Sequence, residues 1–378
     1  MKKLVLIGPV YPYKGGISHY TGLLYRALEK SYDVEMISYK MQYPQFLFKK
    51  EQKDYSNNLF KVENAKFLIH TANPFNIIGI GRKIKRKQPD MVIMQWWHPY
   101  FAPCYWLMTM ALGKKIKKLF ICHNVFPHER FPMDRKLTKM TLKRADYYIV
   151  QSKQDEEDLK TIIRNPVYAK TVHPTYNAFK AEGITKEQAR QRIGLNGKDK
   201  VLLFFGFVRE YKGLKHLIKA MPIIKEQIPD IRLLIVGDFG EDRQRYLDLI
   251  MENKVTDVIE IYEGYIPDRE VEKYFASGDL IVLPYESATQ SGIVQIAYGF
   301  EKPVIVTNVG GLPDVVTDGK TGYIVEPRNY KKLAEAVIKY FVSDKEYELV
   351  QNVRKEAERF SWDRMVETIE DFFTDNRK

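Results

Sequence analysis

Two cations three residues apart, Arg209 and Lys212, lie in a short polar segment that follows the apolar run Val201 to Phe205. After Gly213, apolar residues recur at helical spacing, so this stretch predicts a buried strand, a tight loop and the start of a helix. The free N–H groups and the positive dipole end of such a helix start favour an anion. Two cations beside it would add charge-assisted hydrogen bonds to a diphosphate. A solvated basic turn is the alternative reading of these two residues alone.

A second glycine loop follows the first apolar run of the chain. Gly15 and Gly16 stand between a predicted strand, Leu4 to Ile7, and a predicted helix with an apolar stripe. Paired glycines allow the backbone to approach a ligand closely, although a pair of this kind is often only a turn. This loop is therefore a second candidate for ligand contact.

Further candidates follow two more predicted strands, Asp90 to Trp96 and Leu119 to Cys122. His123 stands at the carboxyl end of the second strand, where parallel α/β sheets bind their ligands. The first strand runs into an unusually aromatic segment, whose rings could fill the core or line an acceptor pocket. Three residues of this segment are candidates for acceptor contact: Trp96, Trp97 and His98.

The bulk composition is that of a globular protein of more than one domain. The chain has 378 residues, of which 45% are apolar and 29% charged, and this length allows two sizeable cores. Two cysteines give neither a disulfide framework nor metal-ligand spacing. The apolar start of the chain lacks a cleavage signal and reads as a strand. We therefore expect a cytoplasmic protein that can associate with the inner face of a membrane.

The charge is divided unevenly along the chain. Residues 1–175 hold 30 Lys and Arg against 14 Asp and Glu, whereas the remainder is mildly acidic. The excess concentrates in two clusters: Arg82, Lys83, Lys85, Arg86 and Lys87, and Lys114, Lys115, Lys117 and Lys118. These can be solvated helix ends, or they can meet an anionic membrane surface or an acidic acceptor. Nucleic acid is not expected, because no binding motif accompanies the charge.

Apolar runs alternate with helical patterns in both halves of the chain. This βαβ repetition predicts an α/β fold of two doubly wound parallel-sheet domains. We place a first Rossmann-like domain at residues 1–175, a second at 176–357, and a C-terminal amphipathic helix at 358–378.

The motifs of the chain resemble those of the retaining glycosyltransferases of family 4, which have the GT-B fold with two domains that face a cleft. The resemblance covers essentially the whole chain. It is carried by Gly15-Gly16, by GFVREYKG from Gly206 to Gly213, by PYESATQSGIVQIAYGFEKPVI from Pro284 to Ile305, and by NVGGLPDVVTDGKTGYIVEP from Asn308 to Pro327. In such enzymes the second domain binds a nucleotide diphosphate sugar and the first binds the acceptor.

The resemblance implies roles for individual residues. Arg209 and Lys212 match the pair that holds the donor diphosphate, and His123 matches a histidine that approaches the transferred sugar. The implied donor-binding residues are Gly15, Gly16, Gly206, Glu286, Thr289, Gln290, Ser291, Gly292, Ile293 and Gln295. Most members carry two glutamates in this last region, whereas here the second is absent and Gln295 stands in the matching region. No metal ion or other cofactor is expected, because the cations substitute for one.

The resemblance therefore implies a retaining glycosyltransferase. It would move a sugar from a nucleotide diphosphate sugar to a hydroxyl acceptor, a glycan or lipid-linked glycan of cell-surface polysaccharide synthesis. Two alternatives share the architecture: a nucleotide-sugar 2-epimerase, which needs acid–base side chains that the sequence does not clearly offer, and a non-catalytic partner of another transferase.

Overall fold

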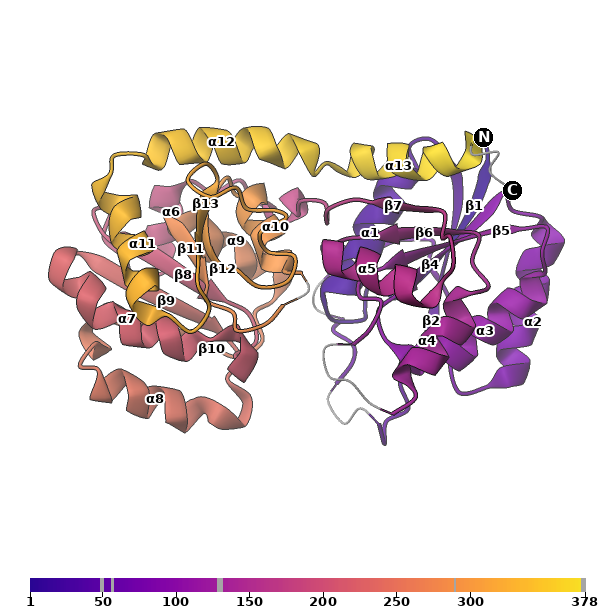
Figure 1. Ribbon diagram of the computed structural model, residues 1–378, viewed down its shortest axis with the longest axis horizontal. Helices are drawn as coiled ribbons and strands as arrows, with labels where there is room; N and C mark the ends of the chain where they lie inside the picture. The colour runs from indigo at the N-terminus through magenta and orange to yellow at the C-terminus, as the bar shows by residue number, and fades with distance from the viewer. Residues whose placement is uncertain (48–50, 56–57, 128–131, 289, 375–378) are drawn as a thin grey trace. The chain divides into compact units, whose positions relative to one another are not determined.

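The computed structural model describes residues 1–47, 51–55, 58–127, 132–288 and 290–374. The chain divides into two compact units (Figure 1). Unit 1 comprises Met1–Val172 and Trp362–Lys378, and unit 2 comprises His173–Ser361. The boundaries placed from the sequence after residues 175 and 357 lie close to these.

Unit 1 is built on a seven-stranded sheet in the order β3-β2-β1-β4-β5-β6-β7, in which all pairs are parallel. Its strands are β1 (Lys3–Ile7), β2 (Asp33–Met41), β3 (Lys66–His70), β4 (Met91–Trp96), β5 (Lys117–Cys122), β6 (Tyr147–Val150) and β7 (Tyr168–Lys170). The central strands are buried on both faces, as expected of a parallel sheet that helices cover on both sides.

Helices cover the two faces of this sheet. One buried apolar cluster joins the sheet to α2 (Pro74–Lys87), α3 (Ala102–Leu112), α4 (Asp134–Leu142) and α5 (Lys153–Ile162). A second joins it to α1 (Gly16–Leu28) and α13 (Trp362–Thr374). The C-terminal helix thus completes unit 1, with Met365 and Ile369 buried in the same cluster as Leu24. A short 3₁₀ turn, η1 (Pro99–Phe101), precedes α3.

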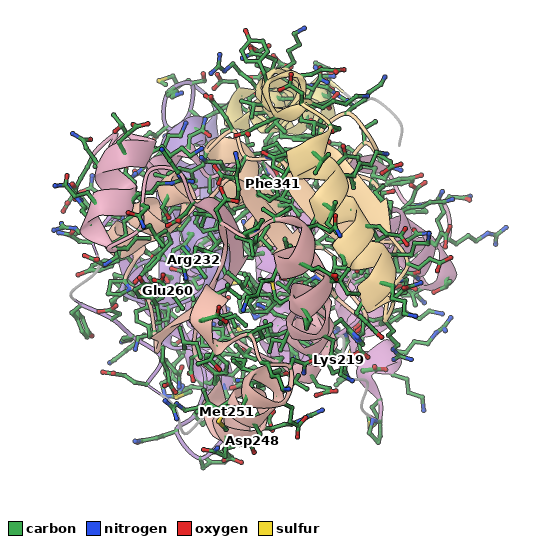
Figure 2. All side chains as sticks on the ribbon, turned by 90° about the vertical axis from the view of Figure 1, so that its left-hand side faces the viewer. Lys219, Arg232, Asp248, Met251, Glu260 and Phe341 are labelled. Atoms are coloured by element: carbon green, nitrogen blue, oxygen red, sulfur yellow. The ribbon has the colours of Figure 1, made fainter. Side chains whose placement is uncertain are left out.

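Unit 2 is built on a six-stranded parallel sheet in the order β10-β9-β8-β11-β12-β13. Its strands are β8 (Lys200–Phe205), β9 (Ile231–Gly237), β10 (Ile259–Glu263), β11 (Leu280–Leu283), β12 (Val304–Thr307) and β13 (Gly322–Val325). Figure 2 shows this unit with Arg232 of β9 and Glu260 of β10 labelled.

The helices of unit 2 are α6 (Lys186–Arg192), α7 (Leu214–Gln227), α8 (Arg243–Glu252), α9 (Asp268–Ser277), α10 (Gly292–Gly299), α11 (Tyr330–Val342) and α12 (Glu346–Arg359). Its 3₁₀ turns are η2 (Asn177–Phe179), η3 (Glu210–Lys212), η4 (Gly240–Asp242) and η5 (Thr256–Val258). The apolar stripe of α7 is fully buried in the core, as its spacing predicts.

The prediction of two doubly wound parallel sheets is confirmed, since each sheet reverses its strand order at the strand that begins the unit. Strand β7 was not predicted, because three residues, none of them buried, carry no periodic signal. None of the helices in the described ranges has the length and apolar character needed to cross a bilayer.

Candidate functional site

The loop after β8 carries the two predicted cations, and it holds them in different environments. Arg209 is exposed, whereas Lys212 ends the η3 turn with only 9% of its surface exposed. The alternative of a solvated basic turn therefore does not hold for Lys212, which is buried. Gly213 follows in the left-handed region with φ 66° and starts α7. Its Cβ position is filled by the Pro284 carbonyl, so only glycine allows this tight turn.

The Lys212 ammonium lies against Gly206 at the end of β8. A Cβ on Gly206 would stand 2.9 Å from Lys212 Nζ and 3.8 Å from Ile293 Cδ1, which places the ammonium beside the first turn of α10. The Tyr285 ring lies 5.8 Å away. Burial, together with the nearby charge on Arg209, lowers the pKa of Lys212 to about 8. No group in the described residues accepts a hydrogen bond from this ammonium.

Neighbouring cations are paired, which sets Lys212 and Arg209 apart. Glu210 pairs with Lys215 and Arg245. Arg209, like Lys212, has no carboxylate partner in the described ranges. Two adjacent cations that repel each other, one of them buried, leave an anion as the missing partner.

Glu286, a predicted donor-binding residue, is held in an ion-pair network. Its carboxylate bonds His216 Nε2 and the Arg328 guanidinium at 2.9 Å each, and it pairs with Lys215 at 2.8 Å. Burial opposes ionisation, but these bonds outweigh it and hold the pKa of Glu286 at about 2. The carboxylate is therefore ionised and fixed in place, next to the loop of the two cations.

The predicted donor-binding residues from Gln290 to Gln295 lie in and just before α10, whereas Thr289 falls outside the described residues. Ser291 caps the helix, with its hydroxyl accepting from the Ile293 N–H at 3.3 Å. Gly292 begins the helix, and Gln290 is half-buried just before it.

Gln295 lies deeper in α10 and is only 1% exposed. Neither polar atom of its side chain has a partner within the described residues. Its backbone carbonyl accepts from the Tyr176 N–H at 3.4 Å. This burial argues against the direct contact with the sugar donor that the sequence predicted, because a ligand cannot reach the amide in this arrangement.

In unit 1, the predicted glycine loop is open. Gly15 has φ 108° and stands at the start of α1, and a Cβ on either Gly15 or Gly16 would meet no atom within 4 Å. The positive φ requires glycine at residue 15, and the free space leaves room for a ligand at this helix start.

His123 follows β5 and is buried, with 8% of its surface exposed. Its Nε2 lies 2.7 Å from Gln95 Oε1, and its ring meets the edge of Tyr20 at 4.6 Å. The loop that carries it is anchored by Asp155, whose carboxylate accepts from the Val125 N–H at 2.8 Å. Burial raises the pKa of Asp155 to about 6.

The three predicted acceptor residues have different surroundings. Trp96 is fully buried, and its indole donates to the Val125 carbonyl at 3.2 Å. It is a core residue, so the acceptor contact predicted for it is wrong. Trp97 is half-buried and donates to the Tyr43 hydroxyl at 3.2 Å. His98 is half-buried at the start of η1, and burial lowers its pKa.

The two basic clusters of unit 1 meet at one place, because the Cβ position of Gly113 lies 3.3 Å from Lys85 Nζ. Three of their members are already engaged. Lys118 is buried and pairs with Asp146, Lys117 donates to the Phe372 carbonyl, and Lys87 pairs with Glu35. Lys118 is therefore not a surface cation, whereas Lys117 is partly exposed and Lys87 is exposed. The exposed members without such contacts in the described ranges are Arg82, Lys83, Lys85, Arg86, Lys114 and Lys115.

Sequence reasoning missed Gln95 and Tyr20, which hold His123, and Tyr285 beside Lys212. One signal was available for Gln95, since it is the polar residue within the apolar strand β4. For the two tyrosines the sequence offers no distinguishing signal.

Two family descriptions match successive parts of the chain. Residues 14–179 match "Glycosyltransferase Family 4", and residues 185–360 match "Glycosyl transferases group 1". The chain is 30% identical over 224 residues to Spore coat protein SA of Bacillus subtilis, covering 55% of this chain and 56% of that protein. It is also 30% identical over 233 residues to the uncharacterized glycosyltransferase MJ1607 of Methanocaldococcus jannaschii, covering 58% of each. The matches thus span little more than half the length of these relatives.

The fold is shared with solved structures. The crystal structure of Anabaena Alr3699/HepE in complex with UDP and glucose covers 99% of this chain and 100% of that chain, with a TM-score of 0.74 and 14% sequence identity. At this identity the likeness establishes the fold alone.

Proposed function

Since the chain belongs to the glycosyltransferases of group 1 and family 4, we propose that it transfers a sugar from a nucleoside diphosphate sugar to a hydroxyl acceptor. The observation that carries this proposal is the Lys212 ammonium, which is buried beside Gly206 and the first turn of α10 without an anionic partner in the described residues. A diphosphate would supply that partner.

The chemistry asked of this loop is stabilisation of the leaving group. When the bond from the sugar to the diphosphate breaks, negative charge grows on the bridging oxygen. A cation placed there stabilises the transition state more than the ground state. Lys212 is desolvated and fixed, so its charge acts at full strength, while Arg209 adds planar paired hydrogen bonds from the exposed side. The HepE crystal structure contains UDP, a nucleoside diphosphate.

The remaining proposed roles concern the sugar of the donor and the acceptor. Glu286, fixed by Lys215, His216 and Arg328, would accept hydrogen bonds from the sugar side of the donor, and His123 would orient the transferred sugar. We propose retention at the anomeric carbon, as in the family that the motifs resemble. Trp97 and His98, half-buried after β4, are the proposed contacts for a glycan or lipid-linked glycan acceptor.

A lipid-linked acceptor would require the protein to reach a membrane surface. The exposed cations at the C-terminal end of α2 and after α3 are suited to this, because each basic residue near an anionic surface contributes about 1 kcal/mol. We expect the protein to sediment with vesicles that contain anionic lipid and to be released by salt. Arg82→Glu together with Lys83→Glu should weaken that binding, whereas Lys118→Met should not, since Lys118 is buried. Equal binding to neutral vesicles would contradict this surface.

The test of the donor site is thermal stabilisation by nucleoside diphosphates in the presence of a chelator. A ligand at 100 times its dissociation constant adds about 2.7 kcal/mol. The matching nucleoside monophosphate, which lacks the second phosphate, is the control and should stabilise much less. The configuration of the product formed from the donor so identified, read by NMR of its anomeric proton, then tests retention. Absence of stabilisation by every nucleoside diphosphate, or an absolute need for a divalent ion, would refute the proposal.

A further inference from the structure

Four residues at the carboxyl ends of neighbouring strands form a polar row on one face of the unit 1 sheet. Gln95 is the last but one residue of β4, and Gly8, His123 and Gln151 directly follow β1, β5 and β6. Alternate residues of a strand share a face, and the preceding residues of the same parity on these strands belong to the buried cluster under α1 and α13. The row is covered by Tyr20 of α1, whose ring packs on His123 and whose hydroxyl accepts from Gln151 Nε2 at 3.1 Å.

Within this row, Gln95 makes its side-chain contact with His123. Gln95 Oε1 lies 2.7 Å from His123 Nε2, and Gln95 is 0% exposed. Its amide nitrogen has no hydrogen-bond partner within the described residues. An amide buried with one donor unsatisfied costs free energy that an apolar residue would avoid. The packing of the core therefore does not explain a glutamine at this position.

Gly8 makes room for this glutamine. A Cβ on Gly8 would stand 2.6 Å from Gln95 Cγ and 3.0 Å from Thr21 Oγ1. Real Cβ atoms do not approach other atoms so closely, so any larger residue would displace the Gln95 side chain. Glycine directly after β1 therefore leaves the space that the Gln95 side chain occupies beside the imidazole.

We propose that Gln95 is a positioning residue, which fixes the imidazole of His123 through Nε2 and so sets the orientation in which it meets the transferred sugar. This inference rests on the proposed function for the role of His123. With Gln95 Oε1 facing the ring, a neutral imidazole carries its proton on Nε2. An amide also fixes the ring without the negative charge of a carboxylate, which would favour the imidazolium form.

The effect of a charge at residue 95 on His123 can be distinguished from the effects of the other titratable groups near this loop. Tyr20 of α1 packs on the His123 ring, whereas Cys122 of β5 belongs to the cluster on the opposite face of the sheet and Asp155 of α5 anchors the loop through Val125. Burial raises the pKa of both Tyr20 and Cys122, so both are neutral near pH 7. Asp155 is the ionised member of the three, and it is engaged by the Val125 N–H and the Ser152 hydroxyl.

The experiment follows the imidazole directly in the full chain. Histidine labelled with ¹³C and ¹⁵N is incorporated, and His123→Asn identifies the His123 signals among those of the seven histidines. Gln95→Glu places a carboxylate at the same contact, so the His123 ring should protonate at a pH higher by about one unit or more. Gln95→Leu should change the ¹⁵N shifts of Nε2 by releasing its partner. Gln151→Leu, which removes a buried amide bonded to Tyr20, is the matched control and should leave the Nε2 shifts in place.

Measurement of kcat then tests whether the contact between Gln95 and His123 affects catalysis. With the donor identified by the stabilisation assay, Gln95→Leu should lower kcat about 10- to 100-fold, with nucleoside diphosphate affinity unchanged. Gly8→Ala, which displaces Gln95 without altering it, should reproduce the same loss and serves if a Gln95 variant does not fold. An unchanged imidazole titration in Gln95→Glu, or parental kcat in Gln95→Leu, would overturn the inference. A parent protein with no transferase activity would instead overturn the proposed function, while the titration still decides the Gln95 contact.

Discussion

Replacement of Lys212 by methionine should stabilise the folded protein at neutral pH while it removes the affinity for a nucleoside diphosphate. The ammonium is buried, without an acceptor in the described residues, and its pKa falls from 10.5 to about 8. Each pKa unit corresponds to about 1.4 kcal/mol, so this burial costs the folded state about 3 kcal/mol at pH 7. Methionine has a similar length and no charge, and it can occupy the space between Gly206 and Tyr285.

The sign of the pH dependence follows from the lowered pKa. Between about pH 8 and pH 10.5 the unfolded chain holds a proton on Lys212 that the folded chain has lost. The parent protein therefore gains stability from this residue as pH rises through that range. We expect Lys212→Met to exceed the parent in unfolding free energy by about 3 kcal/mol at pH 7. The difference should shrink towards zero as pH approaches 10.5.

The assay has to measure the stability of unit 2, which contains Lys212. All four tryptophans of the chain, Trp96, Trp97, Trp106 and Trp362, belong to unit 1, so tryptophan fluorescence does not serve. Amide hydrogen exchange of peptides from β8 and α10 gives the opening free energy of unit 2 at each pH.

Lys219→Met is the matched control for this substitution. Lys219 is an exposed lysine of α7, labelled in Figure 2, and its replacement should change stability by less than about 0.5 kcal/mol. A saturating nucleoside diphosphate should stabilise the parent and Lys219→Met but not Lys212→Met. A Lys212→Met protein that is less stable than the parent at pH 7 would show that the ammonium has a structural partner, and the reasoning would fail.

Three further outcomes follow from the same structure. Arg209→Lys should leave stability unchanged, since the side chain is exposed, but should weaken nucleoside diphosphate binding in a calorimetric titration, because lysine cannot reproduce a planar paired contact. Gly206→Ala should abolish that binding while the sheet stays intact by circular dichroism, because φ is 105° and the new Cβ would lie 2.9 Å from Lys212 Nζ. Asp155, whose pKa burial raises from 3.8 to about 6, should make the parent lose stability as pH rises between these values; in urea unfolding, Asp155→Asn should not show that loss.

The strand–loop–helix units could be predicted because their signal is local. The apolar run from residue 201 to 205 and the helical stripe after Gly213 correspond to β8 and α7 within one residue at each start. The start of α5 has a local cause of the same kind, since the Ser152 hydroxyl accepts from the Asp155 N–H and acidic residues stand in the first turn. Periodicity and capping depend on residues that are neighbours in sequence, so they can be recognised before the fold is known.

The burial of individual side chains could not be predicted in the same way. Trp96 and Trp97 are adjacent aromatics, yet the first lies in the core and the second is half-buried, because the strand β4 ends between them. Lys212 is surrounded in sequence by polar residues, and its burial comes from Gly206 and α10, more than 80 residues further along at Ile293. Such contacts depend on which strands lie side by side, and the order of the strands is a property of the whole sheet.

One group near the carboxyl end of a strand in each unit lacks a partner in the described residues, and the two differ in kind. In unit 2 this group is a cation, Lys212, and in unit 1 it is a neutral amide, Gln95, beside the imidazole of His123. Each destabilises the folded chain, so folding alone gives no reason for either. Transfer of a sugar from a diphosphate needs positive charge where the leaving oxygen becomes negative, whereas the sugar itself needs fixed orientation. A charged partner for His123 would alter the protonation of the imidazole, and it would fix the orientation of the ring no better than the amide of Gln95 does. A glutamine beside the histidine and an unpaired lysine at the diphosphate are therefore the residue types that this division of work requires.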